Sequence, residues 1–209
     1  MTKKLFIVFE GIDSSGKTTQ AQLLKDSFLA NRELAVISSE PSNGIIGNLI
    51  RQALKQRIVF SKDRNLFDRQ MAYLFAADRH DHLYNDVDGV FKQISDNHHV
   101  ISTRYYFSSL AYNCDTAEQF KFVQKLNDDF PDPDLTIYID IPLEVSLARL
   151  KERSLQEIYE TKNKLARVKQ QYQSIFAAYQ GTILIVDGTQ SQSLIHHQIV
   201  DKIQKLSQF

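Results

Sequence analysis

A glycine-rich octapeptide near the N-terminus constrains this chain more than any other feature. Residues 11–18 run Gly-Ile-Asp-Ser-Ser-Gly-Lys-Thr and directly follow the apolar run Leu5–Phe9. That run predicts a buried strand, and the residues from Thr18 onward predict a helix. At such a strand-to-helix junction, a G-x-x-x-x-G-K-[ST] pattern typically forms a loop that wraps phosphate groups. The sequence therefore predicts a nucleotide-phosphate site.

The residue types of this loop suit the chemistry of a polyphosphate. Glycines let the backbone curl so that N–H groups point at phosphate oxygens, and the N-terminus of the following helix adds positive dipole. Lys17 is expected to reach the β- and γ-phosphates, and the Thr18 hydroxyl is expected to ligate Mg²⁺. The residues expected to contact the nucleotide are Gly11, Ser14, Ser15, Gly16, Lys17, Thr18 and Thr19.

Composition indicates an ordinary globular protein. The 209 residues suit one domain, 1–209, and 43% of them are hydrophobic. The net charge is zero, so no broad basic surface is expected to bind nucleic acid or a membrane. The single cysteine, Cys114, cannot form an internal disulfide. The first apolar run is too short for a signal peptide, and we expect a cytoplasmic protein.

Five short β-rich runs alternate with longer stretches that have helical spacing. This alternation predicts the α/β class, with a five-stranded parallel sheet flanked by helices in three layers. Ligands bind such sheets at the carboxyl ends of the strands. The expected strands are 5–9, 34–38, 100–102, 135–141 and 183–186. The clearest expected helices are 64–83, 143–151, 155–179 and 190–206.

Further motifs narrow the class of nucleotide-binding protein. The chain has no Asn-Lys-x-Asp motif for guanine, which argues against a GTPase. Residues 9–20 run F-E-G-I-D-S-S-G-K-T-T-Q, and Glu-Pro occupies 40–41. Residues 74–79 run L-F-A-A-D-R, 104–112 run R-Y-Y-F-S-S-L-A-Y, and 133–140 run P-D-L-T-I-Y-I-D. Over nearly its whole length the chain resembles the thymidylate kinases, P-loop enzymes that phosphorylate dTMP to dTDP with ATP and Mg²⁺.

The resemblance implies roles for residues on the acceptor side. Asp13 would face the acceptor sugar and orient an arginine, although an aspartate favoured by the helix dipole is an alternative. Pro41 would line the acceptor site. Arg79 would bind the monophosphate, since a guanidinium among apolar residues needs an anion. Phe75 would stack on thymine, and plain core packing is nearly as good an explanation.

The stretch after the third expected strand carries the remaining acceptor residues. By resemblance, Arg104 would grip the transferring phosphoryl group, and Tyr105 would lie against the sugar and disfavour a 2′-hydroxyl. Ser108 and Tyr112 would contact the thymine edge from the next helix. Asn113 would do the same, or lie at a solvated helix end.

Thymidylate kinases place a catalytic arginine either in the phosphate loop or in a lid. The loop has no basic residue between Gly11 and Gly16. The resemblance therefore assigns this charge to Arg149 and Arg153, in a lid at about 149–161, alongside the catalytic residues Lys17, Arg104 and Asp13. Arg149 and Arg153 are four residues apart and would share a helix face, so they repel unless a polyanion neutralises them. A solvated charged face is the alternative.

Several positions depart from the family pattern. In the loop after the second expected strand, Ser39 replaces an arginine and Ser42-Asn43 replaces Gly-Gly. Thr103 stands where the family's D-R-Y motif carries an aspartate that helps to hold water-bound Mg²⁺. Threonine can hydrogen-bond but brings no charge, so a lower metal affinity or rate is expected, which Glu10 or Asp13 could partly offset. Ile158 replaces the arginine of the lid motif E-R-Y-E. The catalytic positive charge of the lid would therefore depend more on Arg153.

The resemblance implies a thymidylate kinase that makes dTDP on the way to dTTP and acts as a homodimer on small nucleotides. Because the acceptor phosphate is already anionic, positioning and charge neutralisation would do most of the catalysis. Two alternatives stay open at this point. One is another nucleoside monophosphate kinase, and the other is a catalytically weakened homologue that binds nucleotides.

Overall fold

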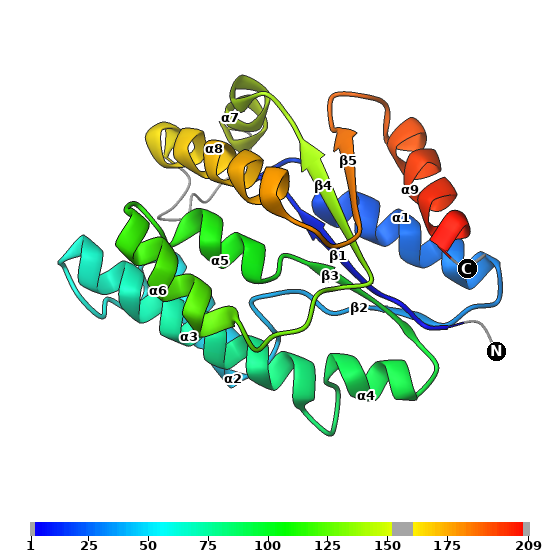
Figure 1. Cartoon of the computed structure of the whole chain (residues 1–209), viewed down its shortest axis with the longest axis horizontal. Helices are drawn as coiled ribbons and strands as arrows, with labels where there is room; N and C mark the ends of the chain where they lie inside the picture. The colour runs from blue at the N-terminus through cyan, green and yellow to red at the C-terminus, as the bar shows by residue number, and fades with distance from the viewer. Residues whose placement is uncertain (1–2, 152–160, 207–209) are drawn as a thin grey trace.

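Five parallel strands form the centre of the structure (Figure 1). The computed structural model describes residues 3–151 and 161–206. The strands lie in the order β2-β3-β1-β4-β5, and every neighbouring pair is parallel. Their bounds are β1 Phe6–Glu10, β2 Ala35–Ile37, β3 His99–Thr103, β4 Leu135–Asp140 and β5 Ile183–Asp187. The predicted parallel sheet and the α/β class are confirmed.

The central strand β1 is buried along its whole length and contributes to two hydrophobic cores. Phe6 and Val8 pack on one face of the sheet, and Ile7 and Phe9 pack on the other. Successive side chains of a strand point to opposite faces, so a continuous apolar run feeds both cores. A parallel strand covered on both sides requires this pattern.

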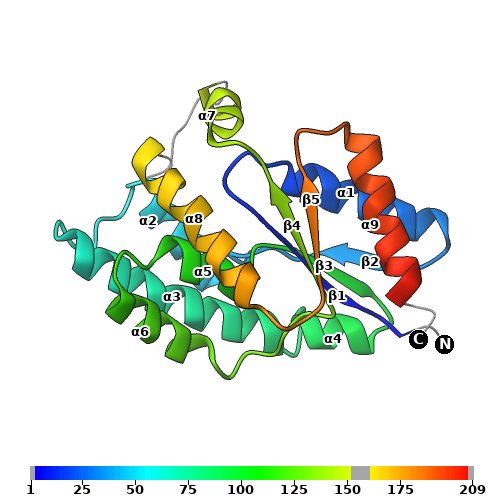
Figure 2. The ribbon, with the colours of Figure 1, turned by 45° about the horizontal axis from the view of Figure 1, so that its top comes forward.

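Helices cover both faces of the sheet and give it three layers (Figures 1 and 2). On one face, α1 (Lys17–Ala30) and α9 (Gln192–Leu206) bury Leu24 and Ile199 against the sheet. The opposite face carries the larger core and the other helices of the described residues. These helices are α2 Ile45–Leu54, α3 Arg64–Tyr84, α4 Val90–Ser95, α5 Tyr106–Tyr112, α6 Ala117–Asn127, α7 Leu143–Lys151 and α8 Lys162–Ala178.

Most expected helices are present close to their expected bounds. The helices expected at 64–83, 143–151 and 190–206 correspond to α3, α7 and α9. The helix expected at 155–179 is observed from Lys162 onward, and its first part lies outside the described residues. Residues 152–160 of the expected lid also lie outside them.

The helices α2, α4 and α6 were not assigned from the sequence. The interior of α2 contains Gly47, which lowers its intrinsic helix propensity. A side-chain Cβ at this position would lie 2.0 Å from the carbonyl oxygen of Ser42. Gly47 therefore lets α2 pack directly against the loop that follows β2.

The strand order places the glycine-rich loop at the switch point of the sheet. Strands β2 and β3 lie on one side of β1, whereas β4 and β5 lie on the other. The loop after β1 therefore stands where the strand order reverses, which is where open parallel sheets bind ligands. Within residues 3–151 and 161–206, no helix is long and apolar enough to cross a membrane.

Candidate active site

The loop between β1 and α1 has the backbone geometry that its glycines allow. Gly11 and Gly16 have φ angles of 147° and 104°, in the region that favours glycine. A Cβ on Gly11 would lie 2.6 Å from the carbonyl oxygen of Ile139, so this position also needs a small residue for packing against β4. Ser14 adopts a left-handed conformation with φ 59°. The loop therefore curls tightly over the end of the sheet.

Lys17 opens α1 and points back into the loop. Its side-chain Nζ donates hydrogen bonds of 2.8 Å to the carbonyl oxygens of both Gly11 and Ile12. The residue is 8% exposed, so its ammonium group sits inside the curl of the loop. A cation held there faces any anion that the loop encloses.

A cavity of about 500 Å³, called here the larger cavity, opens over this loop. Its lining includes all six residues 14–19, together with Thr103 at the end of β3. On the far side it reaches Gly188 and Gln190, which follow β5. The expected nucleotide-contacting residues thus share one cavity, except Gly11, which packs closely against Ile139 of β4.

Arg149 of α7 also lines the larger cavity. Its Nη1 donates to the carbonyl oxygen of Ser14 at 3.1 Å, and its Nη2 donates to that of Gly188 at 3.4 Å. Arg149 therefore bridges the glycine-rich loop and the segment after β5. The second expected lid arginine, Arg153, lies outside the described residues.

A smaller cavity of about 250 Å³ adjoins the larger one. Three residues, Asp13, Glu40 and Arg104, line both cavities. The predicted acceptor-side residues line the smaller one, namely Asp13, Pro41, Phe75, Arg79, Arg104, Tyr105, Ser108 and Tyr112, and so does Asn113. The structure thus brings these residues together from four separate stretches of sequence, namely residue 13, 40–41, 75–79 and 104–113.

An ion pair between Asp13 and Arg104 marks the junction of the two cavities. Tyr112 donates its hydroxyl to Asp13 Oδ2 at 2.8 Å, and Arg104 Nη1 donates to Ser108 Oγ at 3.1 Å. The guanidinium also lies 4.9 Å from the centre of the Tyr112 ring. Burial raises the pKa of the Tyr112 phenol well above its ordinary value, which keeps it a neutral donor. Asp13 therefore pairs with an arginine at the junction, and its expected place facing an acceptor sugar stays a prediction.

The backbone of Arg104 is itself unusual, because its φ is 81°. Its N–H donates to the carbonyl oxygen of Phe9 at 2.8 Å, and its carbonyl oxygen accepts from Ser102 Oγ at 2.8 Å. A non-glycine residue persists in this region only where its surroundings determine it, and such residues cluster at functional sites.

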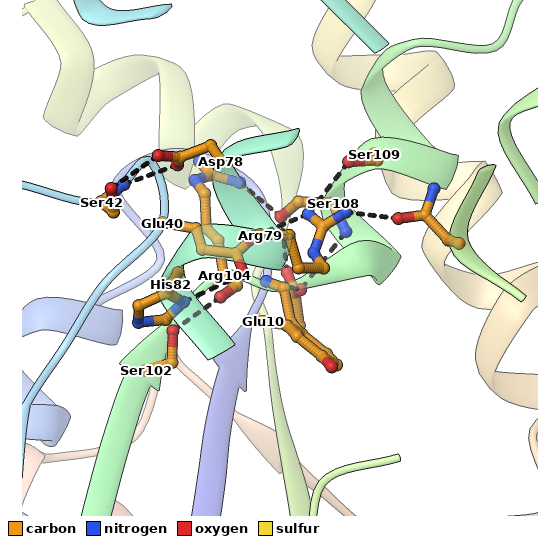
Figure 3. Close-up of polar contacts among 12 residues, drawn as sticks. Glu10, Glu40, Ser42, Asp78, Arg79, His82, Ser102, Arg104, Ser108 and Ser109 are labelled. Carbon is orange, nitrogen blue, oxygen red and sulfur yellow. Dashed lines mark hydrogen bonds and ion pairs between the residues drawn. The ribbon is translucent and has the colours of Figure 1, made fainter. Parts of the chain in front are cut away.

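Arg79 already has an anionic partner inside the fold. Its guanidinium is 1% exposed and is already paired, because Nη2 donates to Glu40 Oε2 at 2.6 Å (Figure 3). It also donates to Ser109 Oγ at 3.2 Å and to Asn127. The expectation that Arg79 requires a ligand anion was therefore wrong, since Glu40 supplies the negative charge. Arg79 still lines the smaller cavity.

Tyr105 lines the smaller cavity, but its hydroxyl is bound by the fold. The residue is fully buried, and its hydroxyl donates to the carbonyl oxygen of Pro131 at 2.9 Å. Its ring packs edge-on against Phe6 and lies 5.3 Å from the guanidinium carbon of Arg79. The Tyr105 hydroxyl is therefore bound within the fold. The hydroxyl that lies at the junction of the two cavities belongs to Tyr112.

Glu10, suggested as a compensating charge for Thr103, lines neither cavity. It is fully buried, and its carboxylate accepts hydrogen bonds of 2.7 Å from the Tyr105 N–H, the Ser108 hydroxyl and the Tyr172 hydroxyl. Burial raises its pKa, although the charge of Arg104 and these hydrogen bonds oppose the shift. Glu10 lines neither cavity, so its contacts anchor α5 and α8 to β1.

Sequence reasoning missed two charged residues of the smaller cavity, Arg51 and Glu40, and also its lining residues Leu54 and Ser109. Arg51 of α2 lines it and donates to the carbonyl oxygen of Pro41 at 2.7 Å. Glu40 lies at the junction and pairs with Arg79. Arg51 is the single charged residue of the stretch 45–54, and this was the available signal for it. No local sequence pattern indicated that Glu40 pairs with Arg79.

The larger cavity offers oxygen donors that suit a hard cation. The hydroxyls of Thr18 and Thr103 line it, and Thr103 Oγ1 donates to Ser39 Oγ at 2.8 Å. Among the residues that the structure describes, no three His, Cys, Asp or Glu side chains gather as a metal site. Mg²⁺ binds through few protein ligands with waters and substrate phosphates, so this donor set fits it.

The fold and these adjoining cavities define a P-loop kinase of small nucleotides. A profile of the family described as Thymidylate kinase matches residues 9–199. The chain belongs to the thymidylate kinase family.

Relatives bearing that family's name cover nearly the whole chain. A protein of Methanococcus aeolicus described as "Probable thymidylate kinase" is 36% identical over 95% of this chain and 95% of its own length. One from Pyrococcus horikoshii with the same description is 34% identical over 93% of each chain. A relative in Treponema pallidum, also described with the family name, is 33% identical over 96% of this chain and 95% of its own.

Proposed function

We propose that this protein transfers the γ-phosphoryl group of ATP to dTMP and releases dTDP and ADP. The observation that carries the proposal is the pair of adjoining cavities that share Asp13, Glu40 and Arg104. The larger cavity contains the phosphate-binding loop and suits the donor. The smaller cavity contains further arginines and suits a monophosphate acceptor. A donor and an acceptor in these cavities would meet at Arg104.

The proposed chemistry is in-line attack of an acceptor phosphate oxygen on the γ-phosphorus. The oxygen–phosphorus bond to the acceptor forms as the bond to the ADP leaving group breaks. The acceptor phosphate is already anionic, so the protein needs no strong general base. Lys17 and the loop N–H groups would bind the donor phosphates, and Arg104 would neutralise charge that develops at the junction.

Mg²⁺, when bound, would supply charge neutralisation on the donor phosphates, and Thr18 is the residue proposed to ligate it. Arg149 would add a cation beside the loop, since it already contacts the Ser14 carbonyl. The catalytic role of Arg153 is proposed from the family resemblance. We also propose a single domain with a lid at about 149–161, and a cytoplasmic location.

On the acceptor side, Arg79 and Arg51 would contribute cations, and Phe75 would offer its ring to the base. Ser108 and Tyr112 would hold Arg104 and Asp13 in place, as their hydrogen bonds indicate. We also propose a homodimer. This proposal is supported by the family resemblance and by half-exposed apolar residues such as Leu66 and Tyr73 on α3.

A coupled assay with purified protein tests the function directly. The protein is incubated with ATP, Mg²⁺ and, in turn, dTMP, dUMP, UMP, CMP or AMP, and ADP release is followed. The highest kcat/KM is expected for dTMP. Preference for another acceptor would replace dTMP in the proposal. Binding of ATP without turnover on any acceptor would favour a catalytically weakened homologue, the alternative that the uncharged Thr103 suggests.

A further inference from the structure

Three side chains of α3 hold the loop that follows β2 (Figure 3). Asp78 accepts hydrogen bonds from Ser42, at 2.7 Å from its N–H and 2.5 Å from its hydroxyl. Arg79 and His82 both bind Glu40. All three α3 side chains are buried, so this contact belongs to the interior of the fold. The loop it holds forms a wall of both cavities.

Glu40 divides its two carboxylate oxygens between two partners. Oε2 accepts from Arg79 Nη2 at 2.6 Å, and Oε1 lies 3.2 Å from His82 Nδ1. The Glu40 side chain is 2% exposed, so water cannot replace either partner without a structural change. A buried carboxylate oxygen that loses its donor is costly, and the carboxylate would turn to find another.

His82 has no role in the proposed chemistry, yet it is 5% exposed and fully engaged. A carboxylate only accepts hydrogen bonds, so Nδ1 must donate to Glu40. Nε2 lies 2.8 Å from Ser38 Oγ, a hydroxyl that can donate or accept. The imidazole therefore spans the loop from Ser38 to Glu40 and sets the orientation of the Glu40 carboxylate.

From this geometry we propose that His82 is a positioning residue for acceptor binding. His82 holds one oxygen of Glu40, so that the other oxygen directs Arg79 at the smaller cavity. The inference rests on the proposed function only in taking the smaller cavity as the monophosphate site. It predicts that loss of the His82–Glu40 contact weakens acceptor binding and leaves donor binding and the chemical step nearly unchanged.

Two substitutions separate the two contacts of the ring. His82→Asn places an amide N–H near the position of Nδ1 and can keep the contact with Glu40. His82→Gln places an amide near the position of Nε2 and keeps the contact with Ser38 instead. Both variants remove the ring, so they damage packing similarly. Only the partner that is lost distinguishes them.

His82→Gln is expected to raise the KM for dTMP about tenfold, with less than a twofold change in kcat and in the KM for ATP. His82→Asn is expected to restore the KM for dTMP to within about threefold of the wild-type value. Equal KM values for dTMP in the two variants would overturn the proposal. So would a parallel rise in both KM values for His82→Gln.

The matched control is His99, a second buried histidine beside a carboxylate. It is 3% exposed, its Nε2 lies 2.8 Å from Glu33 Oε2, and its ring stacks on Phe28 at 4.0 Å. It begins β3, at the end of the sheet opposite the cavities. His99→Asn and His99→Gln are expected to lower the melting temperature and leave both KM values unchanged. A rise in the dTMP KM in these variants would make the His82 effect a general loss of stability.

Two further measurements keep the outcome decisive. If the wild-type chain phosphorylates no acceptor, the proposed function fails, and the dTMP affinities of the two His82 variants, measured by calorimetry, still test the positioning role. If His82→Gln does not fold, the imidazole ¹⁵N resonances of His82 in the wild-type protein carry the test, assigned by their loss in His82→Asn. They are expected to shift at saturating dTMP, and unchanged resonances would overturn the proposal.

Discussion

Replacement of Asp13 by asparagine removes the negative charge that holds Arg104 at the junction of the two cavities. Asparagine keeps one oxygen that can accept from the guanidinium, so the change is mainly electrostatic. We expect kcat to fall because Arg104 is held less firmly. We expect the KM for ATP not to rise, because a carboxylate that repels phosphates has been removed from the larger cavity.

The size of the effect follows from the exposure of the pair. Two unit charges about 4 Å apart attract by about 4 kcal/mol at an effective dielectric constant of about 20. The Arg104 and Asp13 side chains are 20% and 18% exposed, so solvent screens part of this attraction. A coupling energy of about 2 kcal/mol is reasonable for such a partly buried pair. It corresponds to a fall of about 30-fold in kcat.

A double-mutant cycle measures that coupling directly. Asp13→Asn, Arg104→Lys and the double variant are compared by steady-state kinetics with dTMP and ATP. The double variant is expected to lose about 2 kcal/mol less than the sum of the two single losses. Tyr112→Phe serves as the control, since it removes a neutral donor from the same carboxylate and should lower kcat only about fivefold. Additive losses in the cycle would refute the idea that Asp13 acts through Arg104.

Four further substitutions test other parts of the structure. Arg79→Ala is expected to raise the KM for dTMP at least tenfold and far more than the KM for ATP, and equal effects would argue against an acceptor role. Gly47→Ala is expected to lower the free energy of unfolding by about 2 kcal/mol in urea titrations, because its Cβ would lie 2.0 Å from the Ser42 carbonyl oxygen; wild-type stability would contradict the close packing. Burial raises the pKa of Glu10 above its ordinary 4.5. Protonated Glu10 therefore contributes fully to the free energy of unfolding below pH 4.5, and this contribution is lost as the pH rises through the folded-state pKa. Glu10→Gln should remove this dependence, and unfolding curves of the two proteins that stay parallel across pH would show the reasoning to be wrong. Thr103→Asp is expected to raise activity at limiting Mg²⁺, and lowered activity would show that the site has adapted to threonine.

The sheet was predictable because its strands are marked by local sequence. Each apolar run is bounded by polar or turn residues, and a run buried on both faces needs no alternation. The run before Gly11 illustrates this, since all five residues of β1 are buried. The helix α2 was not predictable in this way, because Gly47 opposes helix formation locally and packing against the Ser42 loop compensates for it.

The sequence predicted those site residues whose role depends on the conformation of the neighbouring backbone. Gly11, Gly16 and Lys17 belong to one loop, and their spacing alone predicts its curl. Asp13 was singled out because a carboxylate beside phosphates is unusual. The expectations that went wrong concerned partners distant in sequence, as for Arg79, whose anion is Glu40, 39 residues away.

Local patterns in the sequence were enough to predict the parallel sheet, the phosphate-binding loop after its first strand and the class of chemistry that such a loop supports. These features depend on apolar periodicity and on backbone preferences of neighbouring residues, which a local pattern records. Which charged side chains come into contact depends on the tertiary fold. Asp13 and Arg104 are 91 residues apart and pair because β1 and β3 are adjacent strands in register. Pairing of this kind is set by strand order and register, and no single stretch of sequence contains both.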